Sequence, residues 1–362
     1  MPLAAFHYDL PEAAVAQVPV EPRDAARLLV DGGPGRAPGH HHVHDLPDLL
    51  GPGDLLVVNE TRVLPARLRL RKATGGEAEV LLLERAATGT WIALVRPGRR
   101  LPPGTRLAPD GGGVVVEVGA RLDGGRRVVR LLGGDGAPLD PGDEERALGR
   151  HGAVPLPPYL HEPLADPGRY QTVYATRPGS VAAPTAGLHL TDDLLARCRA
   201  RGADLARVDL AVGLDTFRPV TAEKVEDHVM HSERYRVPAE TLAACAAAER
   251  VVAVGTTTVR ALESAALQPT PPPGTAVEGR TDLFIRDGFP FRVVDALLTN
   301  FHLPGSTLLV LLQAFMGARW RDLYGTALTE GYRFLSFGDA MLVGRGGVGL
   351  PGAGAGAGGP RT

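Results

Sequence analysis

The sequence predicts an α/β protein with a discontinuous large domain and a smaller, inserted antiparallel β domain. Residues 1–62 and 151–343 share buried apolar strands that end in polar residues or helix starts, as α/β folds do. Residues 63–150 instead hold short alternating segments separated by Gly, Pro and Asp, which is typical of a small antiparallel β domain. The Gly/Ala/Pro-rich residues 344–362 are expected to be a disordered tail.

Composition indicates an ordinary globular protein. The chain has 362 residues, 22% charged and 44% hydrophobic, with a formal net charge of −2, so whole-chain charge does not point to nucleic acid. Cys198 and Cys245 read as buried small hydrophobes, without a disulfide framework or a CxxC pattern. No signal peptide is visible, and the longest apolar run, 308–312, is too short to span a bilayer. A cytoplasmic monomer is therefore expected.

The first 62 residues predict a strand at 26–30, a short helix at 45–50 and a buried strand at 54–58. Between them lies a Gly/Pro/His loop whose histidines could bind a metal, but exposed loop histidines are usually incidental, and no metal is expected. The buried strand ends on the polar residues 59–62. Such residues either line a site or form a hydrogen-bonded junction between domains, and the sequence leaves both readings open.

The insert is locally basic. Residues 63–134 carry 13 basic and 6 acidic side chains. This surplus favours contacts with RNA phosphates, for which the candidates are Arg99, Arg100, Arg126 and Arg127. The alternative is that arginine-rich strands only solvate the edge of a sheet.

Residues 178–191 form a Pro- and Gly-stiffened segment ahead of a helix. Pro184 fixes its own φ, Gly187 permits a close backbone approach, and Thr191 caps the helix that follows. The segment thus brings the hydroxyl of Thr185 and the imidazole of His189 to a helix N-terminus. A tight buried connection whose histidine bonds to backbone is the alternative.

Further strands also end in polar residues. The strand 206–212 is followed by 227–233, whose His-x-x-His spacing is only loosely compatible with a metal site. The sequence fixes no third ligand, so these residues are equally suited to acid–base catalysis or hydrogen bonding, and no metal is expected. After an Ala-rich helix at 239–249, the strand 251–255 runs into three threonines that open another helix. A strand, a glycine and hydroxyls at a helix start can cradle a carboxylate or phosphate, although neither GxGxxG nor the P-loop lysine is present.

The last third repeats this arrangement. Strands are expected at 282–285, 292–294 and 332–342, and Asn300 and His302 lie at a strand-to-helix turn before an apolar helix at 308–316 capped by Ser306 or Thr307. Several strand ends thus present hydroxyl, amide or imidazole groups. This clustering favours an active site between strand carboxyl ends and helix N-termini.

Six of these segments together resemble the S-adenosylmethionine:tRNA ribosyltransferase-isomerase family of queuosine synthesis. The resemblance runs from Phe6 to about Leu342. The segments that carry it are 53–63 (GDLLVVNETRV), 170–174 (YQTVY), 182–189 (AAPTAGLH), 227–233 (DHVMHSE), 254–260 (VGTTTVR) and 299–304 (TNFHLP). It implies a barrel-like large domain with a β-rich insert.

The resemblance also implies a reaction and its partners. The ribosyl group of S-adenosylmethionine is transferred to the aminomethyl group of preQ1 at the tRNA wobble position and isomerised to an epoxycyclopentanediol, with adenine and methionine released. S-adenosylmethionine is then a substrate, and no prosthetic group is required. His189 and His302 are the implied proton carriers, with Thr185, Asn300 and Asp295 as orienting groups.

The same resemblance implies a substrate-binding set. The methionine carboxylate suits Thr256, Thr257 and Arg260 at a helix N-terminus. The other expected contacts are Asn59, Thr61, Arg62, Tyr170, Gln171, Asp215, His228, His231, Glu233 and Thr258.

One segment departs from the family pattern. Where that pattern reads His-Val-Gly-x-Gly-Thr-Phe, this chain has Ala211 and Asp215 at the first and fifth positions. An imidazole is lost and a carboxylate gained, which would repel RNA phosphate but accept an amine or ribose hydroxyls. A related enzyme with a nucleoside or deazapurine acceptor, and a non-catalytic binding relative, are therefore the alternatives to tRNA modification.

Overall fold

The computed structural model describes residues 1–213 and 222–350 and falls into two compact units. The large unit contains Met1–Thr61, Pro158–Arg177 and the chain from Ala183 onward, and the insert unit contains Arg62–Pro157 and Pro178–Ala182. The insert unit thus takes in 151–157 and 178–182, which the sequence assigned to the large domain. The reason is backbone pairing, because Gly152 lies opposite Leu68 and the amide of Leu64 donates to the carbonyl of Ser180.

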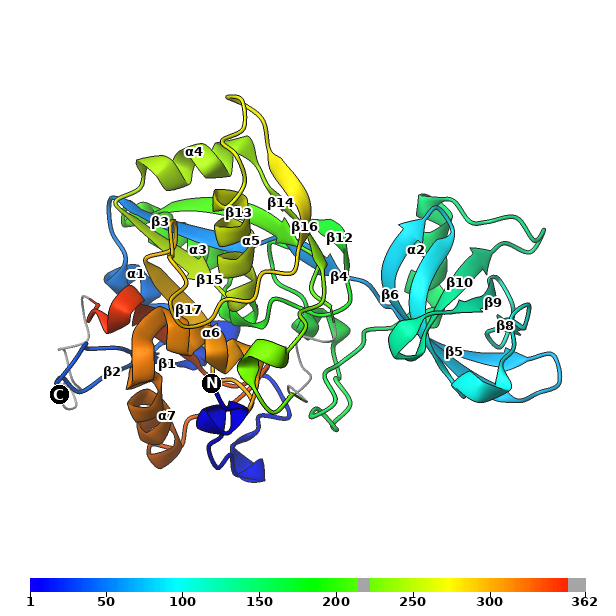
Figure 1. The fold of residues 1–362 in the computed structure, drawn as a ribbon, viewed down its shortest axis with the longest axis horizontal. Helices are drawn as coiled ribbons and strands as arrows, with labels where there is room; N and C mark the ends of the chain where they lie inside the picture. Colours follow the sequence, from blue (N-terminus) through cyan, green and yellow to red (C-terminus); the bar gives the residue numbers. More distant parts are fainter. Residues whose placement is uncertain (214–221, 351–362) are drawn as a thin grey trace. The chain divides into compact units, whose positions relative to one another are not determined.

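A nine-stranded mixed sheet forms the centre of the large unit (Figure 1). In spatial order its strands are β16 (Val277–Thr281), β14 (Glu233–Val237), β13 (Asp204–Leu210), β3 (Asp54–Asn59), β15 (Arg250–Val254), β17 (Ala296–Asn300), β18 (Ala340–Gly344), β1 (Arg27–Val30) and β2 (Gly39–His42). The four adjacent strands β13, β3, β15 and β17 are parallel. Their carboxyl ends therefore share one edge, where open α/β sheets place their ligand sites.

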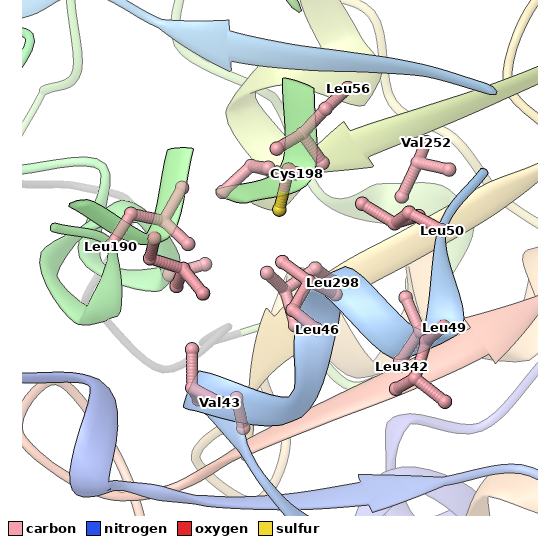
Figure 2. Close-up of a cluster of buried hydrophobic side chains, with 14 of the residues drawn as sticks. Val43, Leu46, Leu49, Leu50, Leu56, Leu190, Cys198, Val252, Leu298 and Leu342 are labelled. Carbon is pink, nitrogen blue, oxygen red and sulfur yellow. The ribbon is translucent and has the colours of Figure 1, made fainter. Parts of the chain in front are cut away.

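Helices cover both faces of this sheet. On one face, α1 (Leu46–Leu49) and α3 (Asp192–Ala200) pack against β3, β15, β17 and β18. Figure 2 shows Cys198 of α3 in this cluster together with Leu46, Leu56, Val252, Leu298 and Leu342 from the other elements. On the other face, α5 (Thr256–Ala266) contacts β13, β3, β15 and β17. Each fully buried leucine of the core contributes about 1.5–3 kcal/mol relative to an exposed one. Helices α4 (Ala239–Ala247), α6 (Thr307–Met316) and α7 (Trp320–Thr329) complete the large unit.

The insert unit is an antiparallel β barrel with one helix, α2 (Pro141–His151). Its strands are, in spatial order, β11 (Gly152–Ala153), β5 (Arg67–Lys72), β6 (Glu77–Ala87), β7 (Thr90–Arg96), β10 (Arg126–Leu132), β9 (Val115–Arg121) and β8 (Arg106–Ala108). A further pairing of β8 with β5 closes six of them into a ring. The predicted α/β class and antiparallel insert are confirmed. The ring of strands closes in the insert and not in the large unit, whose sheet has β16 and β2 as its two edge strands. A separate two-stranded sheet is formed by β12 (Arg177–Ser180) and β4 (Thr61–Val63).

Three expected strands are shifted, because their backbone groups bond to side chains or turns. The amides of residues 292–294 donate to the carboxylate of Glu263, at 2.9–3.1 Å, and β17 begins only at Ala296. The segment 282–285 follows β16, and its Leu283 carbonyl accepts from Arg260 at 3.1 Å. The last strand begins at Ala340. Before it the chain turns through Leu335, whose φ of 70° is left-handed and therefore incompatible with a strand.

The chain beyond β18 is partly ordered, contrary to the tail expected from residue 344. The amide of Leu350 donates to the carbonyl of Asp31, and its side chain packs on the core of the large unit. Residues 351–362, the rest of that expected tail, lie outside the described residues. Within the described part of the chain, no helix has the length and apolarity that a bilayer crossing requires.

Candidate active site

A cavity opens at the carboxyl edge of the parallel strands, with a space of about 590 Å³ that includes open solvent at its mouth. Its walls are the ends of β15 and β17, the starts of α5 and α6, a 3-10 helix (Thr185–His189) and the turn before β18. The lining residues are Tyr159, Ala183, Pro184, Thr185, Ala186, Val212, Gly255, Thr256, Thr257, Thr299, Asn300, Phe301, His302, Leu303, Ser306, Leu308, Leu335 and Ser336.

Asn300 joins three walls of the cavity. Its Oδ1 accepts a hydrogen bond from the Thr185 hydroxyl at 3.0 Å, and its Nδ2 donates to the carbonyls of Leu335 (3.1 Å) and Asp339 (3.4 Å). Asn300 is only 3% exposed, so these bonds are made away from bulk water. The position of Thr185 therefore depends on the last residue of β17.

The start of α5 forms a second wall. Gly255 has a φ of 86°, a conformation that glycine adopts at little cost, and it turns β15 into the helix. Thr256 and Thr257 line the cavity, while buried Asn59 supports them by donating to Thr257 Oγ1 at 3.3 Å. The Thr258 hydroxyl donates to the carbonyl of Val254 at 2.7 Å and faces the helix instead.

His302 is the imidazole of the cavity wall. Its Nε2 lies 3.2 Å from the Thr299 hydroxyl, and its amide donates to the Tyr324 hydroxyl at 2.8 Å. Burial lowers the pKa of His302 to about 3, because no acid compensates the desolvation of an imidazolium. The side chain is thus neutral at neutral pH.

Acid should weaken the fold through His302. Between about pH 6.5 and 3 the unfolded chain binds a proton that the native His302 does not, so stability falls as pH falls through this window. From neutral pH to about pH 5.5 this one group should remove about 1.4 kcal/mol from the free energy of unfolding. Denaturant titrations at both pH values check this. A His302→Gln variant should show a correspondingly smaller loss, and an unchanged loss would contradict the assignment.

The described lining is electrically neutral. It contains no Lys, Arg, Asp or Glu. Burial also raises the pKa of Tyr159, whose hydroxyl lies 2.6 Å from Ser336 Oγ, so this phenol stays protonated. A charged ligand in this cavity would therefore interact mainly with helix N-termini and neutral hydrogen-bonding groups.

His189 lies beneath the cavity and does not line it. Its Nδ1 is 3.2 Å from the carbonyl of Ala186, and its Nε2 is 2.8 Å from that of Gly338. Burial lowers its pKa. Both ring nitrogens therefore face backbone, and the imidazole holds the Thr185–His189 turn against the loop that precedes β18.

Arg260 and Glu233 form a buried ion pair behind α5 instead of reaching the cavity. They are 6% and 8% exposed, and Glu233 also accepts the amide of Gly213 at 3.0 Å. Arg260 donates in addition to the carbonyl of Leu283. Arg260 is not among the lining residues of the cavity, in contrast to the role expected for it, and its buried Nη2 has no partner in the structure.

Asp295 lies at the wrong end of its strand for the expected orienting role. It precedes the first residue of β17, accepts the amide of Val251 at 3.0 Å and pairs with Arg345 at 2.8 Å. Five residues of extended chain, roughly 16 Å, separate it from Asn300.

Other predicted contacts also lie outside the lining. The ring of His228 packs edge-on against Phe284, and His231 is exposed. Tyr170 is fully buried against Phe337. Arg62 belongs to the insert unit, and Asp215 lies outside the described residues. The backbone carbonyl of Gln171 accepts a hydrogen bond from Arg23 at 2.8 Å, and the backbone amide of Thr61 donates to Asn59 Oδ1 at 3.2 Å.

Of the four arginines expected to contact RNA, three are exposed. Arg99, Arg100 and Arg126 face solvent. Arg127 is 2% exposed and donates to the carbonyls of Gly98, Leu101 and Gly119, so it is a structural residue of the barrel. Strand alternation decides this difference, because neighbouring residues of β10 face opposite sides.

Several lining residues were not predicted as site residues. Tyr159 and Ser336 come from loops without a distinctive motif, and Thr299, in β17, belongs to the segment 299–304 but was not named as a site residue. Ser306 was expected only as a helix cap, and Leu335 stands out only through its left-handed φ of 70°. Backbone strain of this kind gathers at functional sites, but sequence does not reveal it.

One group among the described residues has metal-ligand geometry. Nitrogens of His42 and His44 and an oxygen of Asp45 lie within 4.8 Å of one another. The two imidazoles are stacked and exposed at the end of β2. The group is remote in sequence from every lining residue, and Asp45 already accepts the amide of His42 at 2.9 Å.

The fold and this cavity define an α/β protein with a candidate ligand site at the carboxyl edge of a mixed sheet. The profile of the family described as "Queuosine biosynthesis protein" matches residues 3–343. The S-adenosylmethionine:tRNA ribosyltransferase-isomerase of Moorella thermoacetica is 50% identical over 351 residues, covering 95% of this chain and all of the relative. That of Rubrobacter xylanophilus is 51% identical over 344 residues, covering 95% and 98%.

A solved structure is similar over nearly the whole chain. The crystal structure of S-adenosylmethionine tRNA ribosyltransferase from Thermotoga maritima is 36% identical, covers 93% of this chain and 99% of its own, and superposes with a TM-score of 0.52. The chain belongs to the queuosine biosynthesis protein family.

Proposed function

We propose that this protein transfers the ribosyl group of S-adenosylmethionine to the 7-aminomethyl group of preQ1 at the wobble position of tRNA. The ribosyl group is isomerised in the process, which gives epoxyqueuosine with release of adenine and methionine. The observation that carries this function is 50% identity, over the whole length of a relative, to an S-adenosylmethionine:tRNA ribosyltransferase-isomerase. S-adenosylmethionine serves as substrate, and no prosthetic group is part of the proposal.

The chemistry suits a neutral cavity. The sulfonium acidifies the C5′ hydrogens of the ribose, so a weak base can begin the sequence. Elimination then expels adenine, and attack by the amine with epoxide closure expels methionine. The sulfonium brings the positive charge, and the residues described in the lining, which include no Lys or Arg, do not repel it.

His302 is the proposed proton acceptor, because it is the imidazole of the described lining. It is always in its basic form at neutral pH, and a carboxylate bound beside it would raise its pKa and make it a better base. Thr185 and Asn300 are proposed to orient the ribose through their hydroxyl and amide. His189 enters as a positioning residue, since both of its ring nitrogens face backbone carbonyls.

Adenine release tests this function. The purified protein with S-adenosylmethionine and preQ1-bearing tRNA should release adenine and methionine, and unmodified tRNA should give none. Release with free preQ1 or its nucleoside but not with tRNA would instead support the small-molecule acceptor favoured by Ala211 and Asp215. Binding without release from any acceptor would support a non-catalytic relative.

We also propose that the protein acts in the cytoplasm, where its tRNA substrate would be, and that it acts as a monomer.

The exposed arginines of the barrel are proposed to contact tRNA phosphates. Replacing Arg99, Arg100 and Arg126 together by glutamine should weaken tRNA binding and reduce the slope of log K against log salt by about 2–3. Binding assays over a series of salt concentrations measure this. The buried Arg127 provides the contrast, because Arg127→Gln should lower barrel stability and leave the salt slope unchanged. An unchanged slope in the triple variant would remove the phosphate role from the insert.

A further inference from the structure

The hydroxyl of Ser306 is an unsatisfied polar group in the cavity wall. Ser306 is 4% exposed, and its Oγ has no hydrogen-bond partner in the structure. Buried hydroxyls are nearly always hydrogen-bonded, and one without a partner calls for a ligand or an ordered water. Since Ser306 lines the cavity, a bound ligand can supply that partner.

Ser306 is also the N-cap of α6, a helix of ten residues. Its side chain makes no capping bond, although serine usually caps by accepting a first-turn amide. The first amide of α6 that bonds within the helix is that of Leu309, which donates to the Ser306 carbonyl at 3.1 Å. The amides of Thr307 and Leu308 are the orphan donors of this helix start, and Leu308 lines the cavity.

The start of α5 is differently occupied. The Thr257 hydroxyl accepts a hydrogen bond from Asn59, the Thr258 hydroxyl donates to the carbonyl of Val254, and Arg260 is paired with Glu233. Of the residues expected to hold the carboxylate, only Thr256 and Thr257 line the cavity. The start of α6 therefore offers a fully buried hydroxyl without a partner beside two orphan amides, whereas at the start of α5 the hydroxyls of Thr257 and Thr258 have partners.

We propose that Ser306 and the first-turn amides of α6 bind the carboxylate of the methionine part of S-adenosylmethionine. The inference rests on the proposed function, which supplies the donor. A carboxylate suits this position because it accepts hydrogen bonds from a hydroxyl and from amides, and the helix dipole favours a negative charge there. No acidic side chain in the described lining competes for these donors.

Binding of two ligands to three proteins tests the proposal. The ligands are S-adenosylmethionine and its decarboxylated analogue, and the proteins are the wild type, Ser306→Ala and Thr256→Val, all measured by calorimetry. Ser306→Ala should weaken S-adenosylmethionine binding roughly tenfold or more and change binding of the decarboxylated analogue little. Thr256→Val should show no loss that depends on the carboxylate.

Two outcomes would overturn the subsite. One is an equal loss of both ligands in Ser306→Ala, and the other is a carboxylate-dependent loss in Thr256→Val instead. Thermal unfolding without ligand tests whether Ser306→Ala is correctly folded. This variant should be as stable as the wild type, because the hydroxyl that it removes has no partner. If the wild type binds S-adenosylmethionine but releases no adenine with preQ1-tRNA, the proposed function fails, and the binding comparison still decides on the subsite.

Discussion

Replacing Asn300 by aspartate is expected to lower kcat/KM for adenine release about a hundredfold or more. The amide of Asn300 donates to the carbonyls of Leu335 and Asp339. An aspartate would turn a buried negative charge toward those two oxygens and place it in a cavity whose described lining contains no Lys or Arg. The cost of such an unpaired buried group exceeds the roughly 2.7 kcal/mol that corresponds to a hundredfold. Steady-state adenine release with preQ1-tRNA measures the effect.

The matched control for this change is Gln268→Glu, the same conversion of amide to acid at an exposed position. It should leave adenine release within a factor of two or so, as surface substitutions usually do. If Asn300→Asp does not fold, Thr185→Val is the second variant. It removes the hydroxyl that donates to Asn300 Oδ1 and should lower kcat/KM for adenine release roughly tenfold. Retention of more than a tenth of the activity in Asn300→Asp would contradict the proposed role.

The largest expected effect on stability comes from Glu263. Its carboxylate is fully buried in α5 and accepts the amides of Arg292, Val293 and Val294. Glu263→Ala would leave these donors without acceptors and should lower the free energy of unfolding by about 3–5 kcal/mol. Glu263→Gln keeps one carbonyl oxygen and should cost less, about 1–3 kcal/mol.

Denaturant unfolding followed by fluorescence measures this loss. The chain has two tryptophans, so a Trp91→Phe background leaves Trp320 to report on the large unit alone. Glu162→Ala, at an exposed position, is the control and should fall within about 0.5 kcal/mol of the background. Equal midpoints for Glu263→Ala and the control would show that the three amides find other acceptors.

The elements that bury apolar side chains could be predicted well. The strand at 54–58 and the helix after Thr191 were found because hydrophobic runs and caps are local signals, and the structure has β3 and α3 there, with Thr191 Oγ1 accepting the amide of Leu194 at 3.1 Å. The strand expected at 292–294 was wrong for a long-range reason. Its amides bond to Glu263, 29 or more residues earlier in the chain, and no local pattern reports such a partner.

The candidate site shows the same division. Polar residues at strand ends predicted the cavity edge with Thr256, Thr257, Asn300 and His302, because carboxyl ends of parallel strands share one edge, and the Pro- and Gly-stiffened segment predicted Thr185. Asp295 was misplaced, since its position at the start of β17 follows only from strand direction and register. Arg127 was expected at the surface beside Arg126. Neighbouring residues of a strand point to opposite faces, so the side chain of Arg127 is buried in the barrel.

The sequence alone thus predicted the family, the α/β class, the antiparallel insert and the sheet edge with the candidate site, but it placed the barrel in the large domain, whereas the ring of strands closes in the insert. Only the tertiary structure decided which polar groups at that edge already have partners. The ring nitrogens of His189 face backbone carbonyls and Arg260 pairs with Glu233, whereas the Ser306 hydroxyl and Arg260 Nη2 have no partner. The physical reason is that hydrogen-bond satisfaction is a property of the packed chain: the groups that complete or withhold a bond come from segments far apart in sequence.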